Sequence, residues 1–331
     1  MISVFYLTGA AGAQKIAETQ LDPTHNVPDE PVWIDLYQPT ADELRLLPQT
    51  LNIALPSREE IWRNHALNRM YTRDGTSYMT AAVLDDVTEG CVPGTSPVTF
   101  ILTPDFLITI RDIDPKPFLT FQEDLLLNPR RYATSADVME GLMEEIINRV
   151  AGDHDKVIKG LDGLSRRIFA DKAFDGQRGN PSLIMRGVLK DLGFTADLNS
   201  KIHESTHSLV RLLTYFKDDH DPHNVVIGRD AERLIKDSRS LSDQSAFLND
   251  KINFQLESAL GMINVEQNLI AKILSVVALI FLPPSLVVGF YGMNFADMPE
   301  LHWKFGYVFA IGVMLVFAVL PWMYFRHKKW L

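Results

Sequence analysis

A long apolar stretch near the C-terminus carries small and polar residues at regular intervals. No charged residue occurs between Ile273 and Ala296, and a run of this length can cross a bilayer as one helix. A helix that serves only as an anchor has no use for polar residues in its middle, yet this run contains Pro283-Pro284 and Ser285. At helical spacing, one face is small or polar with two leucines among its members: Asn268, Ala271, Leu274, Ala278, Leu282, Ser285, Gly289 and Gly292.

Such a face has two physical interpretations. Small and polar residues allow membrane helices to pack closely, and they also suit the wall of a water-filled channel. The proline pair lacks backbone N–H groups, so carbonyl groups upstream lose their helical donors and need either protein or water as partners. The prolines therefore favour a pore. Because one helix cannot enclose a channel, a pore requires a symmetric oligomer with this helix innermost, although the pattern does not fix the number of subunits.

A second uncharged run, Gly306 to Phe325, follows after a short loop, so the two spans must form a hairpin through the membrane. Basic residues flank this hairpin on one side: Lys251 and Lys272 before the first span, and Arg326, Lys328 and Lys329 after the second. The loop between the spans instead carries Asp297 and Glu300 against Lys304. The positive-inside rule then places both termini in the cytoplasm. We expect a multi-pass protein of the plasma membrane, or of the inner membrane of a bacterium.

Composition and motifs exclude several classes of function. A net charge of −10 argues against a nucleic-acid partner, because phosphate binding needs a basic surface. The acidic excess is compatible with attracting cations and equally with ordinary solubilising charge. A single cysteine, Cys91, excludes an internal disulfide and any multi-cysteine metal site. The sequence contains neither a P-loop nor a nucleophile elbow. We therefore expect no organic cofactor and no enzymatic activity.

Residues 1–133 have the mixed texture of an α/β or α+β domain, which the topology above places in the cytosol. Two capping boxes, Thr40–Glu43 and Ser57–Glu60, each open a short helical pattern. Strands are predicted where β-branched and aromatic residues gather: Ile2–Thr8, Val32–Leu36, Tyr78–Leu84, Val98–Thr103 and Phe106–Arg111. Pro104 and Asp105 predict a tight hairpin between the last two.

From residue 134 onward the pattern is helical. Residues 134–224 predict an antiparallel helical hairpin, whose second helix runs from about Ser182 to Phe216 and is followed by a loop over Asp218–His223. A third helix starts near Gly228 and meets no proline until Pro283, with apolar positions close to a heptad repeat. No turn signal separates the stalk, residues 225–271, from the first span, residues 272–292, so the two are predicted to form one continuous rod. An external loop (293–305), the second span (306–325) and a basic cytosolic tail (326–331) complete the chain.

One motif at the end of the first span carries a family resemblance. Tyr291-Gly292-Met293-Asn294-Phe295 is followed by Met298-Pro299-Glu300-Leu301 and, at the C-terminus, by Lys328-Lys329-Trp330-Leu331. Together with Pro283-Pro284, this resembles the CorA family of divalent-cation channels. The clear match covers about residues 250–331, while the N-terminal domain agrees in layout. The resemblance implies a funnel-shaped homopentamer in the bilayer that takes up Mg²⁺, with Co²⁺ or Ni²⁺ as further cargo.

The resemblance also assigns roles to residues of the motif. It implies that Asn294 forms the outer ring that selects the ion, while Gly292 and Met293 shape the turn. Mg²⁺ loses its water reluctantly, so a ring of neutral amide oxygens can hold the hydrated ion through outer-sphere hydrogen bonds. Asn294 is also compatible with a helix C-cap. Glu300 in the loop either concentrates cations before the filter or is an ordinary solvated charge.

Further roles are implied along the pore and in the cytosolic part. Leu274 and Leu282 would form a hydrophobic constriction, Asn268 the cytosolic mouth, and Ser285 a hydrated site, with Ala278 and Gly289 on the same wall. At family positions where methionine lines the pore, this chain has Ala271 and Leu282. In the family, cytosolic Mg²⁺ bridges neighbouring subunits and closes the pore. The nearest matches for such regulatory carboxylates are Asp85, Asp86 and Asp237, each of which is also typical of plain surface charge.

Two alternatives stay open. A related ZntB-like zinc transporter would share the architecture, and His203 and His207, four apart on a helix, could chelate zinc; the methionine of Gly-Met-Asn favours magnesium. A membrane-anchored scaffold or sensor would explain the stalk and hairpin but not the polar face.

Transport of a doubly charged ion needs no nucleotide, since an inside-negative potential supplies about 4.6 kcal/mol per 100 mV.

Overall fold

The structure is a computed structural model. It describes residues 1–8, 15–21, 28–51, 53–66, 70–86, 93–169, 181–219, 225–293 and 303–328. The chain divides into two compact units, Met1–Leu256 and Glu257–Leu331. Helix α6, Val225–Tyr291, contributes to both, which confirms the prediction that stalk and first span form one continuous helix.

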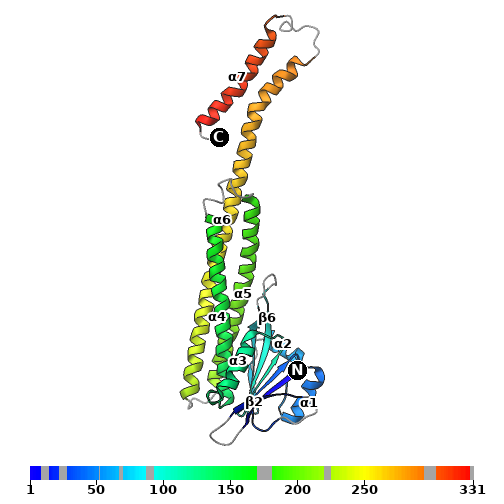
Figure 1. The fold of residues 1–331 in the computed structure, drawn as a ribbon, viewed down its shortest axis with the longest axis vertical. Coiled ribbons are helices and arrows are strands. Elements are labelled where there is room, and N and C mark those ends of the chain that lie inside the picture. The colour runs from blue at the N-terminus through cyan, green and yellow to red at the C-terminus, as the bar shows by residue number, and fades with distance from the viewer. Residues whose placement is uncertain are drawn as a thin grey trace. The chain divides into compact units, whose positions relative to one another are not determined.

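The N-terminal unit is built on a seven-stranded sheet with the order β2-β1-β3-β7-β6-β5-β4 (Figure 1). The strands are β1 Ile2–Thr8, β2 Lys15–Leu21, β3 Pro31–Tyr37, β4 Tyr71–Arg73, β5 Thr76–Leu84, β6 Thr95–Leu102 and β7 Leu107–Arg111. Neighbouring strands are antiparallel except for β3 and β7, which are parallel. The five predicted strands are confirmed. Strands β2 and β4, at the two edges of the sheet, are not predicted from the sequence, because one is largely polar and the other very short.

The helices of this unit are α1 Ala41–Leu51, α2 Arg58–Ala66, α3 Lys116–Leu127, the short η1 Pro129–Arg131, α4 Ser135–Phe169 and α5 Pro181–Asp219. Both predicted capping boxes are confirmed. The Thr40 N–H donates to Glu43 Oε2 at 2.6 Å, and the Glu43 N–H donates to Thr40 Oγ1 at 3.2 Å. Ser57 and Glu60 exchange the same pair of bonds at 2.9 and 3.3 Å. Each box satisfies N–H groups that the first helical turn leaves free.

The sheet has a hydrophobic core on each face. Successive side chains of a strand point to opposite faces, so Trp33 of β3 belongs to one core and its neighbour Ile34 to the other. The first core joins the sheet to α3, α4, α5 and the start of α6, and Trp33 stacks there on Phe5 with ring centroids 4.8 Å apart. The second lies under α1 and α2. Figure 1 shows these helix groups on opposite sides of the sheet.

Helix α5 completes the hydrogen bonding of the sheet beyond the end of short strand β4. Ala82 of β5 is fully buried and stands opposite Pro97 of β6. Its N–H donates to Ser208 Oγ at 2.9 Å, and its carbonyl accepts from Ser205 Oγ at 2.9 Å. Both hydroxyls are themselves buried. Two serines of α5 therefore take the place that a neighbouring strand would otherwise occupy.

Replacing Ser208 by alanine is expected to weaken this junction by about 1–3 kcal/mol, because the buried Ala82 N–H loses its acceptor. Hydrogen exchange of the peptides that cover β5 should then become about 5- to 150-fold faster. Ser200→Ala, an exposed position on the same helix, is the matched control and should leave the exchange unchanged. Equal exchange in the Ser208 variant and in the wild type would contradict the assigned role.

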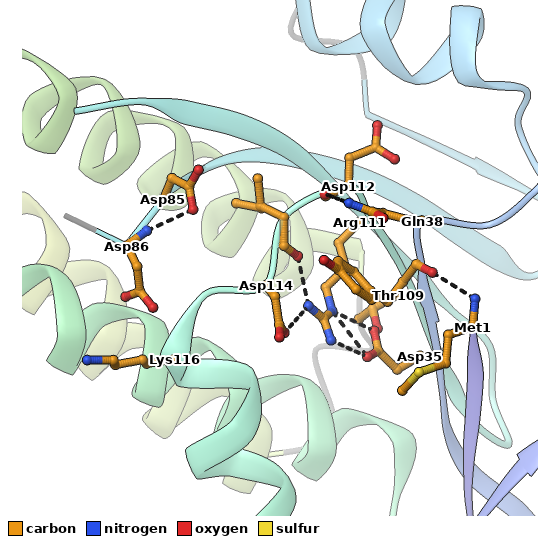
Figure 2. A network of polar contacts seen from close by, with 12 residues as sticks. Met1, Asp35, Gln38, Asp85, Asp86, Thr109, Arg111, Asp112, Asp114 and Lys116 are labelled. Atoms are coloured by element: carbon orange, nitrogen blue, oxygen red, sulfur yellow. Dashed lines mark hydrogen bonds and ion pairs between the residues drawn. The ribbon is translucent and has the colours of Figure 1, made fainter. Parts of the chain in front are cut away.

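A buried polar network connects the two central parallel strands (Figure 2). The Arg111 guanidinium forms a fork with the Asp35 carboxylate, with Nε 3.1 Å from Oδ1 and Nη2 2.8 Å from Oδ2. Thr109 Oγ1 donates to Asp35 Oδ1 at 2.7 Å and accepts from Trp33 Nε1 at 3.0 Å. Arg111 Nη1 reaches the Ile113 carbonyl at 2.7 Å and the Asp114 carboxylate at 2.6 Å.

The electrostatic environment of Arg111 keeps it charged. Although burial acts to lower the pKa of Arg111, the neighbouring Asp35 and Asp114 carboxylates raise it above the ordinary value. The guanidinium also lies against two aromatic rings, 4.7 Å from the centroid of Tyr37 and 4.6 Å from that of Phe118. Both charges of the Asp35–Arg111 pair therefore have hydrogen-bonded partners, which charges inside a protein core require.

One predicted loop is wrong in its first residues. The sequence predicts a helix end at Phe216 and a loop that includes Asp218 and Asp219, whereas α5 continues to Asp219. The Asp219 carboxylate accepts hydrogen bonds from Thr72 Oγ1, at 2.6 Å, and from Ser77 Oγ. These bonds to the β4–β5 hairpin hold the last turn in place. The remainder of that loop, residues 220–223, lies outside the described residues.

Candidate ion pathway and its supporting charges

The small and polar stripe predicted on the first span lies along the C-terminal half of α6. At about 100° per residue, its members from Asn268 to Gly292 occupy roughly 120° of the helix circumference. All of them are exposed: Asn268, Ala271, Leu274, Ala278, Leu282, Ser285, Gly289 and Gly292. The two leucines are among the most exposed apolar residues, Leu274 at 68% and Leu282 at 63%. The described part of this chain therefore leaves the stripe uncovered.

Helix α6 continues through Pro283 and Pro284 without interruption. Because proline has no N–H, the carbonyl groups of Leu279 and Ile280 lose their usual helical donors. Ser285 Oγ donates to the Phe281 carbonyl at 2.8 Å. With its proton used in this bond, the hydroxyl offers acceptor lone pairs outward. An acceptor facing outward suits the water protons around a hydrated cation.

The end of α6 coincides with the start of the Gly-Met-Asn motif. The Gly292 N–H donates to the Val288 carbonyl at 2.9 Å, and the Met293 N–H to the Phe290 carbonyl at 3.3 Å, so the last turn tightens. A Cβ at Gly292 would lie 3.2 Å from the Val288 oxygen, closer than ordinary contact. A glycine is therefore favoured at this turn. The predicted filter residue Asn294 and the loop residue Glu300 lie outside the described residues.

The second predicted span is helix α7, Gly306–His327. In the described part of the chain, α6 and α7 are the helices long and apolar enough to cross a membrane. Almost none of the apolar surface of α7 is buried within the chain; Tyr307, for example, is 78% exposed. Such surfaces need lipid or other protein around them.

The three predicted regulatory carboxylates each have a local partner. Asp86 Oδ1 accepts from Arg149 Nη2 at 2.9 Å, and Asp237 Oδ2 lies 3.7 Å from Arg233 Nη1. Asp85 Oδ1 accepts from the Asp86 N–H at 2.8 Å (Figure 2). Among the described residues, no group of three or more histidine, cysteine or carboxylate side chains is arranged to hold a metal ion. One chain alone therefore does not assemble these residues into a complete metal site.

A charged pocket that no sequence pattern predicts lies where the start of α6 meets α4. Its lining includes Glu140, Glu144, Asp230 and Arg233, and it encloses about 130 Å³. Glu144 bridges two guanidinium groups, with Oε2 2.7 Å from Arg131 Nη2 and Oε1 2.8 Å from Arg233 Nη2. The pocket was missed because its residues are far apart in sequence and no local spacing marks them.

Within this pocket, Glu140 is held in its protonated form near neutral pH. Burial raises the pKa of Glu140 to about 8, with further contributions from the Asp230 and Asp137 carboxylates; Arg233 acts in the opposite direction. Its Oε1 atom is buried and has no hydrogen-bond partner among the described residues. An ionised Glu140 would therefore lie near two further carboxylates, Asp230 at the start of α6 and Asp137 at the start of α4.

This arrangement makes stability depend on pH. Above pH 4.5 the unfolded chain releases the Glu140 proton, whereas the folded protein keeps it until the pH approaches 8. The contribution of Glu140 to the free energy of unfolding is therefore most favourable below pH 4.5 and is lost as the pH rises toward 8. Replacing Glu140 by glutamine should remove this slope and raise the stability at pH 8.5 by roughly 1–2 kcal/mol, since solvent weakens the repulsion. Thermal unfolding between pH 5 and 9 measures the effect. Glu123→Gln, on the exposed side of α3, should keep the wild-type slope.

Comparison with known proteins decides the family. A sequence model described as "CorA-like Mg2+ transporter protein" matches residues 28–327. The chain belongs to this family. The magnesium transport protein CorA of Mannheimia succiniciproducens is 32% identical over 302 residues, which cover 91% of this chain and 92% of that protein. The resemblance predicted from the Gly-Met-Asn motif is confirmed, and Mg²⁺ is the ion that the CorA family transports.

Solved structures share the fold. The complete structure of the CorA magnesium transporter from Methanocaldococcus jannaschii matches with a TM-score of 0.75 at 21% identity, covering 100% of this chain and 99% of that one. The ZntB cytoplasmic domain from Vibrio parahaemolyticus matches with a TM-score of 0.56 at 9% identity, covering 75% of this chain and 93% of that domain. The predicted architecture of a mixed N-terminal domain, a long helix and two candidate spans is confirmed.

Proposed function

We propose that this CorA-family protein is a channel through which the membrane potential drives Mg²⁺ into the cell. The observation that carries the proposal is the exposed small and polar stripe of α6, a membrane-spanning helix. Pro283 and Pro284 lie outside the stripe, and the carbonyl groups that they free would lack partners among acyl chains. Water or a neighbouring subunit must supply those partners. An oligomer with the stripe facing a shared aqueous axis therefore explains both features.

The pore requires several copies of the chain around one axis, and we propose a homopentamer, as the family resemblance implies. Leu274 and Leu282 then form the hydrophobic constriction, which closes when water leaves it. Asn268 lies at the inner mouth and Ser285 at a hydrated site. Ala278 and Gly289 leave room for water along the same wall. The bias of basic residues places both termini in the cytoplasm and the assembly in the plasma or inner membrane.

Selection is assigned to the ring of Asn294 amides at the outer end, shaped by Gly292 and Met293. Amide oxygens accept hydrogen bonds from the water shell and leave the ion hydrated, so release stays fast. Glu300 in the loop would raise the local cation concentration. The described end of α6 supports this assignment, because the helix ends at Tyr291 and the backbone tightens over Gly292 and Met293.

Closure is assigned to cytosolic Mg²⁺ bound between subunits by Asp85, Asp86 and Asp237. In each chain Asp86 and Asp237 already have guanidinium neighbours, Arg149 and Arg233. An incoming ion must compete with these, which gives the weak, reversible binding that suits a sensor of free Mg²⁺. No organic cofactor takes part in this scheme.

Flux into liposomes tests the proposal. Purified protein in vesicles that contain a Mg²⁺ indicator should show uptake that rises with an inside-negative potential and needs no ATP, because the ion gains about 4.6 kcal/mol per 100 mV. Co²⁺ and Ni²⁺ are measured in parallel. The fold shared with the ZntB domain keeps zinc transport as the second candidate, which predicts Zn²⁺ uptake that exceeds Mg²⁺ uptake. Absence of any flux would favour a scaffold and overturn the proposal.

A further inference from the structure

Two histidines of α5 form a pair that the transport scheme does not use. His203 and His207 are four residues apart, a spacing that brings side chains together on one face of a helix. Both side chains are exposed. Their ring centroids are 6.3 Å apart and the rings are inclined by 38°. Small rotations about the side-chain bonds would let one ring nitrogen of each imidazole reach the same ion.

A contact from α6 orients the first of these rings. Ser242 Oγ lies 3.4 Å from His203 Nδ1. When Nδ1 carries the proton and donates to this hydroxyl, Nε2 retains the lone pair that a metal ion needs. Partners of this kind behind a histidine ligand commonly fix its tautomer and ring direction. One ring of the pair, that of His203, is thus oriented by a second helix.

We propose that His203 and His207 form a surface site for a borderline-soft divalent cation of the zinc and nickel class. Imidazole nitrogen suits Zn²⁺, Ni²⁺ and Cu²⁺, whereas Mg²⁺ prefers oxygen ligands. No third histidine, cysteine or carboxylate joins the pair among the described residues, so water completes the coordination shell. The site therefore discriminates against Mg²⁺ by its chemistry, and it does not depend on the proposed channel mechanism.

Occupation of the site should stabilise the contact between α5 and α6. A chelated ion bridges one turn of α5 and immobilises the ring that touches Ser242. Any ion that binds the folded chain preferentially raises its unfolding temperature.

Titration calorimetry of the full chain in detergent with Zn²⁺ and Ni²⁺ tests the site. Saturating Mg²⁺ is present throughout, so that oxygen sites are occupied. We expect one binding event per chain that is at least tenfold weaker in His203→Ala and in His207→Ala, together with a metal-dependent rise in unfolding temperature in the wild type alone. Retention of wild-type affinity and stoichiometry in both variants would overturn the proposal.

A matched variant separates the paired geometry from the mere presence of two histidines. Glu204→His combined with His207→Ala keeps two exposed imidazoles at adjacent positions, which do not face each other on a helix. This variant should bind as weakly as the single alanine variants. Wild-type binding in it would show that spacing is irrelevant, and the site would be rejected. Circular dichroism and elution volume confirm that each variant is folded.

Discussion

Replacing Asn294 by alanine is expected to lower potential-driven Mg²⁺ uptake at least about tenfold. Under the proposed mechanism, every subunit loses the amide oxygen that accepts hydrogen bonds from the hydrated ion. A loss of about 1.4 kcal/mol summed over the ring already gives a factor of ten. Uptake by purified protein in liposomes, compared at equal protein density and fixed potential, measures the effect.

Two further substitutions make this result interpretable. Asn294→Gln keeps an amide and should retain selectivity at a reduced rate, whereas Asn294→Asp should hold the ion more tightly and release it more slowly. Ile273→Ala changes a residue about 160° around α6 from the middle of the stripe, and should leave uptake near the wild-type level. Undiminished selective uptake in Asn294→Ala, with the oligomer intact, would remove the filter from the mechanism.

Replacing Arg111 by methionine is expected to destabilise the N-terminal unit by about 3–5 kcal/mol. The change leaves the Asp35 carboxylate, only 2% exposed, without its counter-ion inside the sheet. An unpaired charge in a core costs far more than the loss of a surface pair. Because natural domains are stable by only about 5–15 kcal/mol, the yield of folded protein should fall sharply. Denaturant unfolding followed by the fluorescence of Trp33, which belongs to the same network, gives the magnitude.

The double variant Asp35→Asn with Arg111→Met should recover much of this loss, because neither charge is then buried alone. Arg58 provides the matched control. It pairs with Asp112 close to the same strand ends but is 59% exposed, so Arg58→Met should cost less than about 1 kcal/mol. Equal effects of Arg58→Met and Arg111→Met would show that burial does not set the importance of the Asp35–Arg111 pair.

Local patterns in the sequence determined much of this protein. Capping boxes at Thr40 and Ser57, the apolar runs of α6 and α7, and the Gly-Met-Asn motif all act over a few neighbouring residues or one helical face. Hydrogen bonds and apolar faces formed by residues a few positions apart depend on sequence spacing, so they can be predicted from the sequence. The family followed from the same kind of signal. The filter role of Asn294 stays a prediction because it depends on copies of the chain around an axis.

Tertiary structure decided the features in which distant segments meet. The Asp35–Arg111 fork joins parallel strands far apart in sequence, Glu140 becomes a weaker acid only when folding buries it, near Asp230 and Asp137, and α5 extends to Asp219 because the β4–β5 hairpin binds its last carboxylate. Edge strands β2 and β4 likewise form because a partner strand is present. The physical reason is common to all of these features. Desolvation and pairing between distant segments arise only after folding has removed water and fixed both partners. Neither effect can be predicted from the spacing of neighbouring residues.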